Sequence, residues 1–160
     1  MSPVAKASAI ISGFLGAGVL TLIHETVRRA VPNAPRMDLL GMRAIDRSLR
    51  AIDQAPPAGP ELHRTALAAD LLFNTLYYSL VGVGQPEHAV TRGTALGLAA
   101  GVGAVALPGL LGLGTDPSQR TPATAAMTII WYLAGGLAAA LAFRALLRGH
   151  GDPQMKSADL

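Results

Sequence analysis

Apolar residues gather into four long stretches that are separated by more polar connections. The stretches are residues 7–27, 65–84, 93–113 and 122–143, and each is close to the roughly 20 residues that a helix needs to cross a bilayer. We expect the first to be retained, because no signal-peptide cleavage site precedes the charged residues after it. The sequence therefore predicts an all-α protein, a single domain over residues 1–160 that forms an integral membrane bundle of four transmembrane helices.

The connection between the first two stretches carries a second pattern. In residues 35–53, apolar positions recur at roughly helical spacing, and Arg and Asp residues mostly fill the gaps between them. The apolar positions are Met37, Leu40, Ile45, Leu49 and Ile52. Such an amphipathic helix is expected to lie in the membrane interface, with its apolar face toward the hydrocarbon. The alternative is a soluble hairpin that packs on the bundle.

Composition agrees with a chain that lies in lipid. Hydrophobic residues make up 51% of it and charged residues 14%, whereas a soluble domain usually carries about 25% charged residues. The sequence contains no cysteine, which excludes disulfides and thiolate metal sites. A net charge of +3 would suit nucleic acid, but no recognition fold or basic stripe with aromatic residues is visible, so no nucleic-acid partner is expected.

Basic residues are unevenly divided between the two sides of the predicted bundle. Eight of the 13 Lys and Arg residues lie on the side of the long loop 28–64, and five lie on the side of the two termini. Cytoplasmic loops carry the excess of Lys and Arg. We therefore expect a multi-pass protein of the inner cell membrane, with loop 28–64 in the cytoplasm and both termini outside. The C-terminal tail is also basic, which reduces the difference.

Small residues form rows at four-residue spacing on two of the predicted helices. The rows are Ala9, Gly13, Ala17 and Thr21 in the first helix and Gly93, Gly97 and Gly101 in the third. Helices in lipid associate through close packing at such residues. The first expectation is therefore a small polytopic membrane protein that acts through helix association, as a homo-oligomer or as an accessory subunit of another membrane protein. The sequence implies no cofactor, and enzymatic activity is not the leading expectation.

Polar residues inside the predicted spans form one candidate site. Its members are His24, Glu25, His63, Asp70, Asn74, Tyr77 and Tyr78. Asp70 follows His63 by seven residues, so it should lie roughly 10 Å deeper in the membrane at 1.5 Å per residue. An acid within a span costs several kcal/mol unless it is paired, hydrated or neutral. Asp70 is therefore either an anchor that Asn74 and the tyrosine hydroxyls satisfy, or part of a functional site.

Two functional alternatives depend on these residues. One is a transporter or channel for protons, ions or small solutes, whose polar path is lined by Asp70, Asn74, Glu25 and His24. The other is a membrane enzyme on lipid-like substrates, in which His24 and Glu25 transfer protons. A zinc or iron site formed with His63 is a weaker hypothesis, because adjacent residues project about 100° apart on a helix and the His-Glu-x-x-His spacing is missing.

A purely structural role is the competing hypothesis for the ionisable residues. Glu25 is spaced to pair with Arg28 or Arg29 within one turn of helix, and His63 is placed to cap the start of its own helix. Both explanations leave the two residues at the hydrated interface of the bilayer.

Overall fold

The computed structural model describes residues 2–149, which form a bundle of α-helices and contain no strand. The all-α prediction is therefore confirmed over this range, and the basic tail with Lys156 lies outside it. The four long helices are α1 (Pro3–Ala30), α3 (Gly59–Tyr78), α4 (Ala89–Leu110) and α6 (Pro122–Gly149). The shorter elements are α2 (Met37–Arg50), α5 (Asp116–Gln119) and the 3-10 turns η1 (Ser79–Gly82) and η2 (Pro86–His88).

Three helical segments in residues 2–149 are long and apolar enough to cross a membrane. They are α1, α6 and Pro86–Leu110, which contains α4. The predicted span 65–84 is not one of these three segments. Its helix, α3, begins six residues earlier and so includes the charged Glu61 and Arg64 in addition to Asp70, and it ends at Tyr78. Length and composition thus indicate a membrane protein, although not clearly one with four apolar spans.

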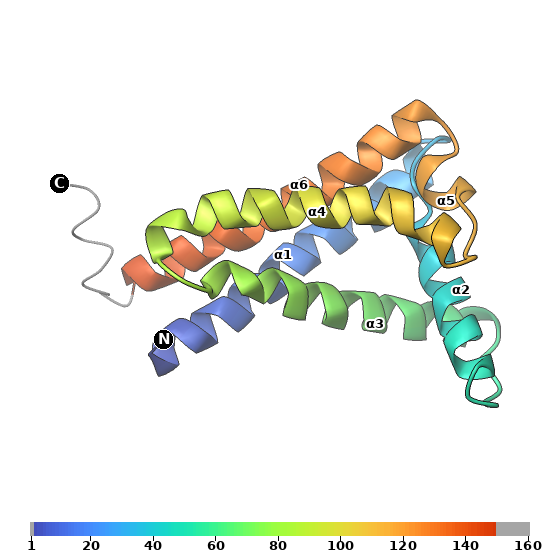
Figure 1. The fold of residues 1–160 in the computed structure, drawn as a ribbon, viewed down its shortest axis with the longest axis horizontal. Helices are drawn as coiled ribbons and strands as arrows, with labels where there is room; N and C mark the ends of the chain where they lie inside the picture. The colour runs from blue at the N-terminus through green and yellow to red at the C-terminus, as the bar shows by residue number, and fades with distance from the viewer. Residues whose placement is uncertain (1, 150–160) are drawn as a thin grey trace.

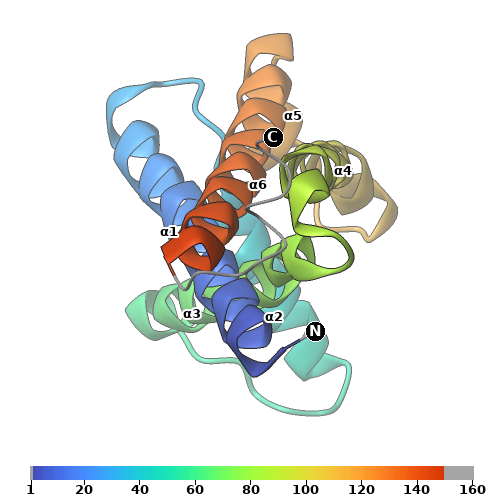
Figure 2. The same ribbon diagram turned by 90° about the vertical axis from the view of Figure 1, so that its left-hand side faces the viewer.

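The four long helices alternate in direction along the chain (Figure 1). α1 and α4 run toward the end of the molecule where α2 and α5 lie, which we call the α2 end, and α3 and α6 run back from it. α6 lies between α1 and α4 and packs closely on both (Figure 2). α3 packs on α1 but makes little contact with α4 or α6. The bundle is therefore tight on the α6 side and loose around α3.

Glycines allow the backbones of α4 and α6 to touch. The predicted row Gly93, Gly97 and Gly101 is buried against α6. A Cβ atom on Gly97 would lie 2.7 Å from the Cα of Leu133, and one on Gly101 would lie 2.7 Å from the Cα of Ile129. Because real Cβ atoms do not come so close to backbone, only glycine fits at these positions. The row is confirmed as a packing face.

The small residues of α1 have the same role against two helices. Gly13 lies against the Thr75 carbonyl of α3, at a distance that leaves no room for a side chain. One turn later, a Cβ atom on Gly16 would lie 2.7 Å from the Cβ of Ala139 in α6. The small face of α1 is thus filled by neighbours from the same chain.

The amphipathic helix α2 lies across the end of the bundle, transverse to the long helices (Figure 1). It is a single helix packed mainly on α3, not a hairpin. Leu40 is buried, whereas Arg43, Arg47 and Arg50 are exposed. The helix and its exposed arginines agree with the predicted pattern, but Ile52 from the predicted apolar face is 65% exposed, and the position of α2 in the membrane interface stays a prediction.

The loop that precedes α2 is fastened to α5 and to the start of α6. The Arg36 N–H donates to the Pro117 carbonyl at 2.8 Å. The Thr124 hydroxyl of α6 donates to the Asn33 carbonyl at 2.9 Å. These two bonds join segments that are more than 80 residues apart, and they fix where α2 enters the end of the bundle.

Gly97→Ala tests the contact between α4 and α6. The added methyl group would meet the Leu133 backbone, so we expect the free energy of unfolding to fall by about 1–3 kcal/mol, the usual cost of overpacking. Gly103→Ala in the same helix is the control, because its Cβ would lie at an ordinary 3.5 Å from the Leu107 side chain. Thermal unfolding in detergent measures both variants. Equal Tm values for the two would contradict the packing described here.

Candidate functional site

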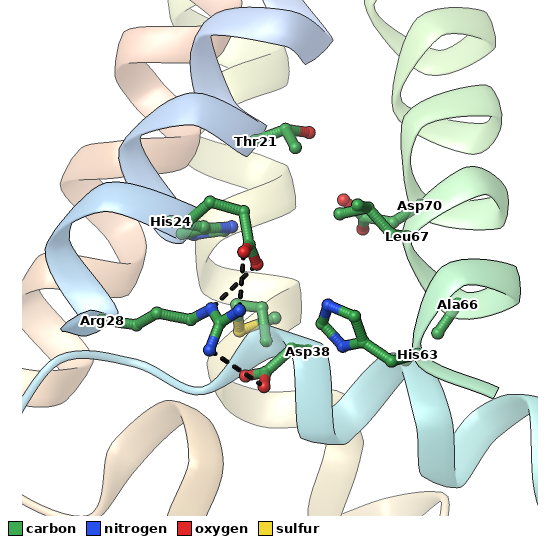
Figure 3. A pocket seen from close by; sticks show the side chains of 11 residues that line it. Thr21, His24, Arg28, Asp38, His63, Ala66, Leu67 and Asp70 are labelled. Carbon is green, nitrogen blue, oxygen red and sulfur yellow. Dashed lines mark hydrogen bonds and ion pairs between the residues drawn. The ribbon is translucent and has the colours of Figure 1, made fainter. Parts of the chain in front are cut away.

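A polar pocket lies between α1, α2 and α3 at the α2 end (Figure 3). α1 and α3 touch at Gly13 and Thr75 and separate toward α2, which closes the gap from below. The pocket is lined by Thr21, His24, Glu25, Arg28, Met37, Asp38, Gly41, His63, Ala66, Leu67 and Asp70. Its free volume is about 20 Å³, which is room for roughly one water molecule.

Four of the seven predicted site residues meet in this pocket. His24 and Glu25 come from the last two turns of α1, and His63 and Asp70 come from the second turn and the middle of α3. Figure 3 shows His63 and Asp70 pointing from α3 toward α1, with Thr21 pointing toward them from α1. Asn74, Tyr77 and Tyr78 do not line the pocket. The structure thus brings these ionisable residues together at one end of the bundle.

His24 is buried deeply in the wall of the pocket. Its side chain is only 6% exposed, and its ring packs against Trp131 and Tyr132 of α6 at centroid distances of 5.2 and 5.7 Å. Its Nε2 atom has no hydrogen-bond partner within residues 2–149. An unsatisfied buried polar group costs about 1–3 kcal/mol. His24 Nε2 is therefore a buried polar atom without a partner, in a side chain that lines the pocket.

Glu25 belongs to a network of charges that joins α1 to α2. Its carboxylate accepts two hydrogen bonds from Arg28, at 2.8 and 2.6 Å, and one from Arg29 at 3.2 Å. Arg28 also lies 3.8 Å from Asp38 of α2, which pairs with Arg36 at 2.8 Å. The predicted pairing of Glu25 with the nearby arginines is confirmed. This carboxylate is therefore largely neutralised.

Asp38 of α2 is the more deeply buried of the two acids in this network. Its side chain is 5% exposed. Burial by itself raises the pKa of Asp38, but the hydrogen bonds and charge of Arg36, with the charge of Arg28, outweigh burial and hold the pKa below its ordinary value. Asp38 therefore stays ionised and ties α2 to α1 at neutral pH.

Asp70 has a different environment. It accepts one hydrogen bond, from the Asn74 amide at 3.0 Å, and no Lys, Arg or His in residues 2–149 forms an ion pair with it. The tyrosines do not satisfy it, which corrects that part of the anchor hypothesis. Tyr77 instead donates to the Leu96 carbonyl of α4 at 3.0 Å, and the buried Tyr78 donates to the Tyr132 carbonyl of α6 at 2.8 Å. Both hydroxyls hold α3 in place.

One other expectation for the site requires correction. His63 does not cap its helix, because α3 begins at Gly59 with Ala58 as its N-cap residue. The proline at Pro60 marks this earlier start, since proline is favoured in the first turn of a helix. No group of three His, Asp or Glu side chains within residues 2–149 is arranged to hold a metal ion, so the zinc or iron hypothesis has no geometric support there.

Two pocket residues were missed by sequence reasoning. The Thr21 hydroxyl lines the pocket and, like His24 Nε2, has no hydrogen-bond partner in the described part of the chain. Asp38 reaches the pocket from α2, because the amphipathic helix turns its first residues inward. Thr21 is the last residue of the small-residue row of α1, and its position in that row predicted that it faces the bundle. No local pattern signals the approach of Asp38 to Arg28.

Comparisons of the chain with protein-family models, with curated proteins and with solved structures give no match. The chemistry of the pocket is therefore the basis for a functional conclusion. It combines an unpaired carboxylate, an unpartnered imidazole nitrogen and an unpartnered hydroxyl around a space for one water molecule. Such a set can accept, store and pass on a proton.

Acid titration should reveal the contribution of Asp38. Because its folded pKa is lowered, its pairing stabilises the protein above the ordinary pKa of 3.8, and this stabilisation is lost as pH falls through the lower folded value. We expect Asp38→Asn to reduce the free energy of unfolding by about 1–2 kcal/mol at pH 7, and the difference from wild type to shrink as the pH falls below 3.8. Thermal unfolding against pH measures this, with the exposed Glu87→Gln as control. A pH-independent difference would contradict the assignment.

Proposed function

We propose that this chain is a four-span protein of the inner cell membrane that takes up protons from its α2 end into the α1–α2–α3 pocket, with Asp70 and His24 as the groups that exchange them. The observation that carries the proposal is the pairing of an uncompensated acid with a buried, unpartnered imidazole in one small pocket. An ionisable residue within the membrane is a functional candidate by default, because its burial is costly.

The direction of the helices supports α3 as a fourth span. α1 and α4 run the same way through the bundle, so if both cross the membrane, the chain between them has to cross back. α3 has 20 residues, or about 30 Å of helix, which is enough to do so. Leu72, Phe73 and Leu76 on its outer face are exposed and suit contact with lipid. Its acidic Asp70 faces the pocket instead.

The basic residues support an orientation with the α2 end in the cytoplasm. Arg28, Arg29, Arg36 and the arginines of α2 lie at this end, together with Arg64 and Arg120. Positively charged residues favour the cytoplasmic side. In this orientation the pocket takes up protons from the cytoplasm, and both chain ends face outward.

Helix association with a second copy or another subunit ranks lower in this proposal. The glycine rows that motivated it are filled by helices of the same chain, so they offer no free surface to a partner. A membrane enzyme on lipid-like substrates also ranks lower, because a pocket with about 20 Å³ of free volume has no room for such a molecule. A proton needs no more space than the pocket provides.

Proton uptake can be measured in liposomes that contain a pH-sensitive dye, with a potassium gradient and valinomycin to impose a potential. We expect flux in wild type, and we expect Asp70→Asn and His24→Phe to reduce it to the level of protein-free vesicles. Asp53→Asn, which changes an exposed carboxylate outside the site, should keep the wild-type flux. Infrared difference spectra should show a protonation-dependent carboxyl band that Asp70→Asn lacks. Equal flux in wild type and Asp70→Asn, with no such band, would reject the proposal.

A further inference from the structure

A second cavity lies on the other side of α3, and it has a different chemistry. α3 and α4 run antiparallel with little contact between them, which leaves a groove of about 580 Å³. This is within the range of roughly 300–1,000 Å³ that ligand sites occupy. Its walls are mostly apolar and include Phe73 and Tyr77 from α3 and Ala100, Gly103, Ala104 and Leu107 from α4. The groove opens sideways, between two helices of the bundle, where lipid chains would lie.

At the α2 end this groove meets an exposed basic surface. The groove is lined as far as Leu111, and the next residues, Gly112 and Leu113, line a cavity of about 540 Å³ together with Arg43, Arg47 and Arg50 of α2. Both cavities also share one face of α3, because Leu62 in the basic cavity and Phe73 in the groove are eleven residues, or about three turns, apart. That separation is roughly 16 Å at 1.5 Å per residue, about the depth of one membrane leaflet.

The arginines at this surface are held in place without being neutralised. Arg43 donates to the Leu113 carbonyl at 2.7 Å, and Arg47 lies 3.5 Å from the Gly112 carbonyl. Gly112 adopts a φ of +67°, a conformation that favours glycine, and a Cβ atom there would lie 2.8 Å from Arg47. Within residues 2–149, neither Arg43 nor Arg47 forms an ion pair. Each guanidinium therefore keeps donors for an anion, since it has five N–H groups.

The third arginine of the surface differs in this respect. Arg50 pairs with Asp46 at 3.0 Å on the exposed side of α2, so its charge is compensated. Positive charge is thus concentrated on Arg43 and Arg47, one helical turn apart, at the mouth of an apolar groove.

We infer that this site binds one anionic phospholipid of the bilayer, with its headgroup phosphate on Arg43 and Arg47 and an acyl chain in the α3–α4 groove. The two unpaired arginines favour an anionic headgroup. The apolar groove beside them favours a molecule with an acyl chain over a free anion. Basic pockets beside transmembrane helices bind acidic lipids for this reason. The inference does not depend on proton uptake at Asp70.

Electron spin resonance with nitroxide-labelled lipids tests this binding in phosphatidylcholine bilayers. Wild type should immobilise labelled phosphatidylglycerol in preference to labelled phosphatidylcholine. An exposed ion pair strengthens binding by up to about fivefold, so the double variant Arg43→Gln, Arg47→Gln should lose up to about 25-fold in preference. Arg64→Gln, at an exposed arginine of α3 that lines neither cavity, is the matched control and should retain most of it. Unchanged preference in the double variant would overturn the inference.

The groove is tested separately with two variants of α4. Ala104→Phe would fill the groove and should release the immobilised acyl chain, whereas Ala106→Phe, on the exposed side of the helix outside the groove, should not. Glycerophosphoglycerol, the headgroup without chains, should fail to displace the labelled lipid. Displacement by it as effectively as by phosphatidylglycerol would mean a free-anion site and would reject the lipid. Should Ala104→Phe not fold, the arginine variants still decide the question.

Discussion

Direct contact between helix backbones, made possible where glycine replaces a side chain, is the constraint on which this structure depends. Lipid tails solvate leucine as well as a neighbouring helix does, so helices in a membrane gain little from hydrophobic exclusion and are held by close packing and hydrogen bonds. α4 touches α6 at Gly97 and Gly101, and α1 touches α6 at Gly16. α3 meets this requirement only near Gly13 and through its tyrosine hydroxyls. The result is a rigid three-helix core with a fourth helix attached near one end.

This unequal packing explains where the polar chemistry lies. Because α3 is fastened near its C-terminal end and separates from α1 and α4 toward the α2 end, a space opens on each side of it. The space toward α1 is closed by α2 and its ion pairs and remains small and polar. The space toward α4 has no such cover and remains wide and apolar. Two cavities with opposite character thus arise from one feature of the fold, and neither requires a special local motif.

The sequence predicted the parts of this arrangement that depend on one helix at a time. Apolar length identified α1, α4 and α6, four-residue spacing identified the packing face that contains Gly97, and the periodicity of residues 35–53 identified α2. It overestimated the apolar character of the second span, because the polar turns that begin α3 belong to the same helix. It also grouped His24 and Glu25 of α1 with Asp70 of α3, but it did not give the specific contacts between helices. Neither the hydrogen bond from Tyr78 to the Tyr132 carbonyl nor the tilted ring contact between His24 and Trp131 can be predicted from local spacing.

The hydrogen bond between Asp70 and Asn74 acquires a particular meaning from these surroundings. Asp70 lines the polar pocket and Asn74 lines the apolar groove, so this pair of side chains, 3.0 Å apart, separates the two cavities. A molecule in the groove would change the surroundings of Asn74 and, through the hydrogen bond, the electrostatic free energy of Asp70. If the groove holds the lipid proposed above, the composition of the bilayer therefore influences the acid–base behaviour of the polar pocket.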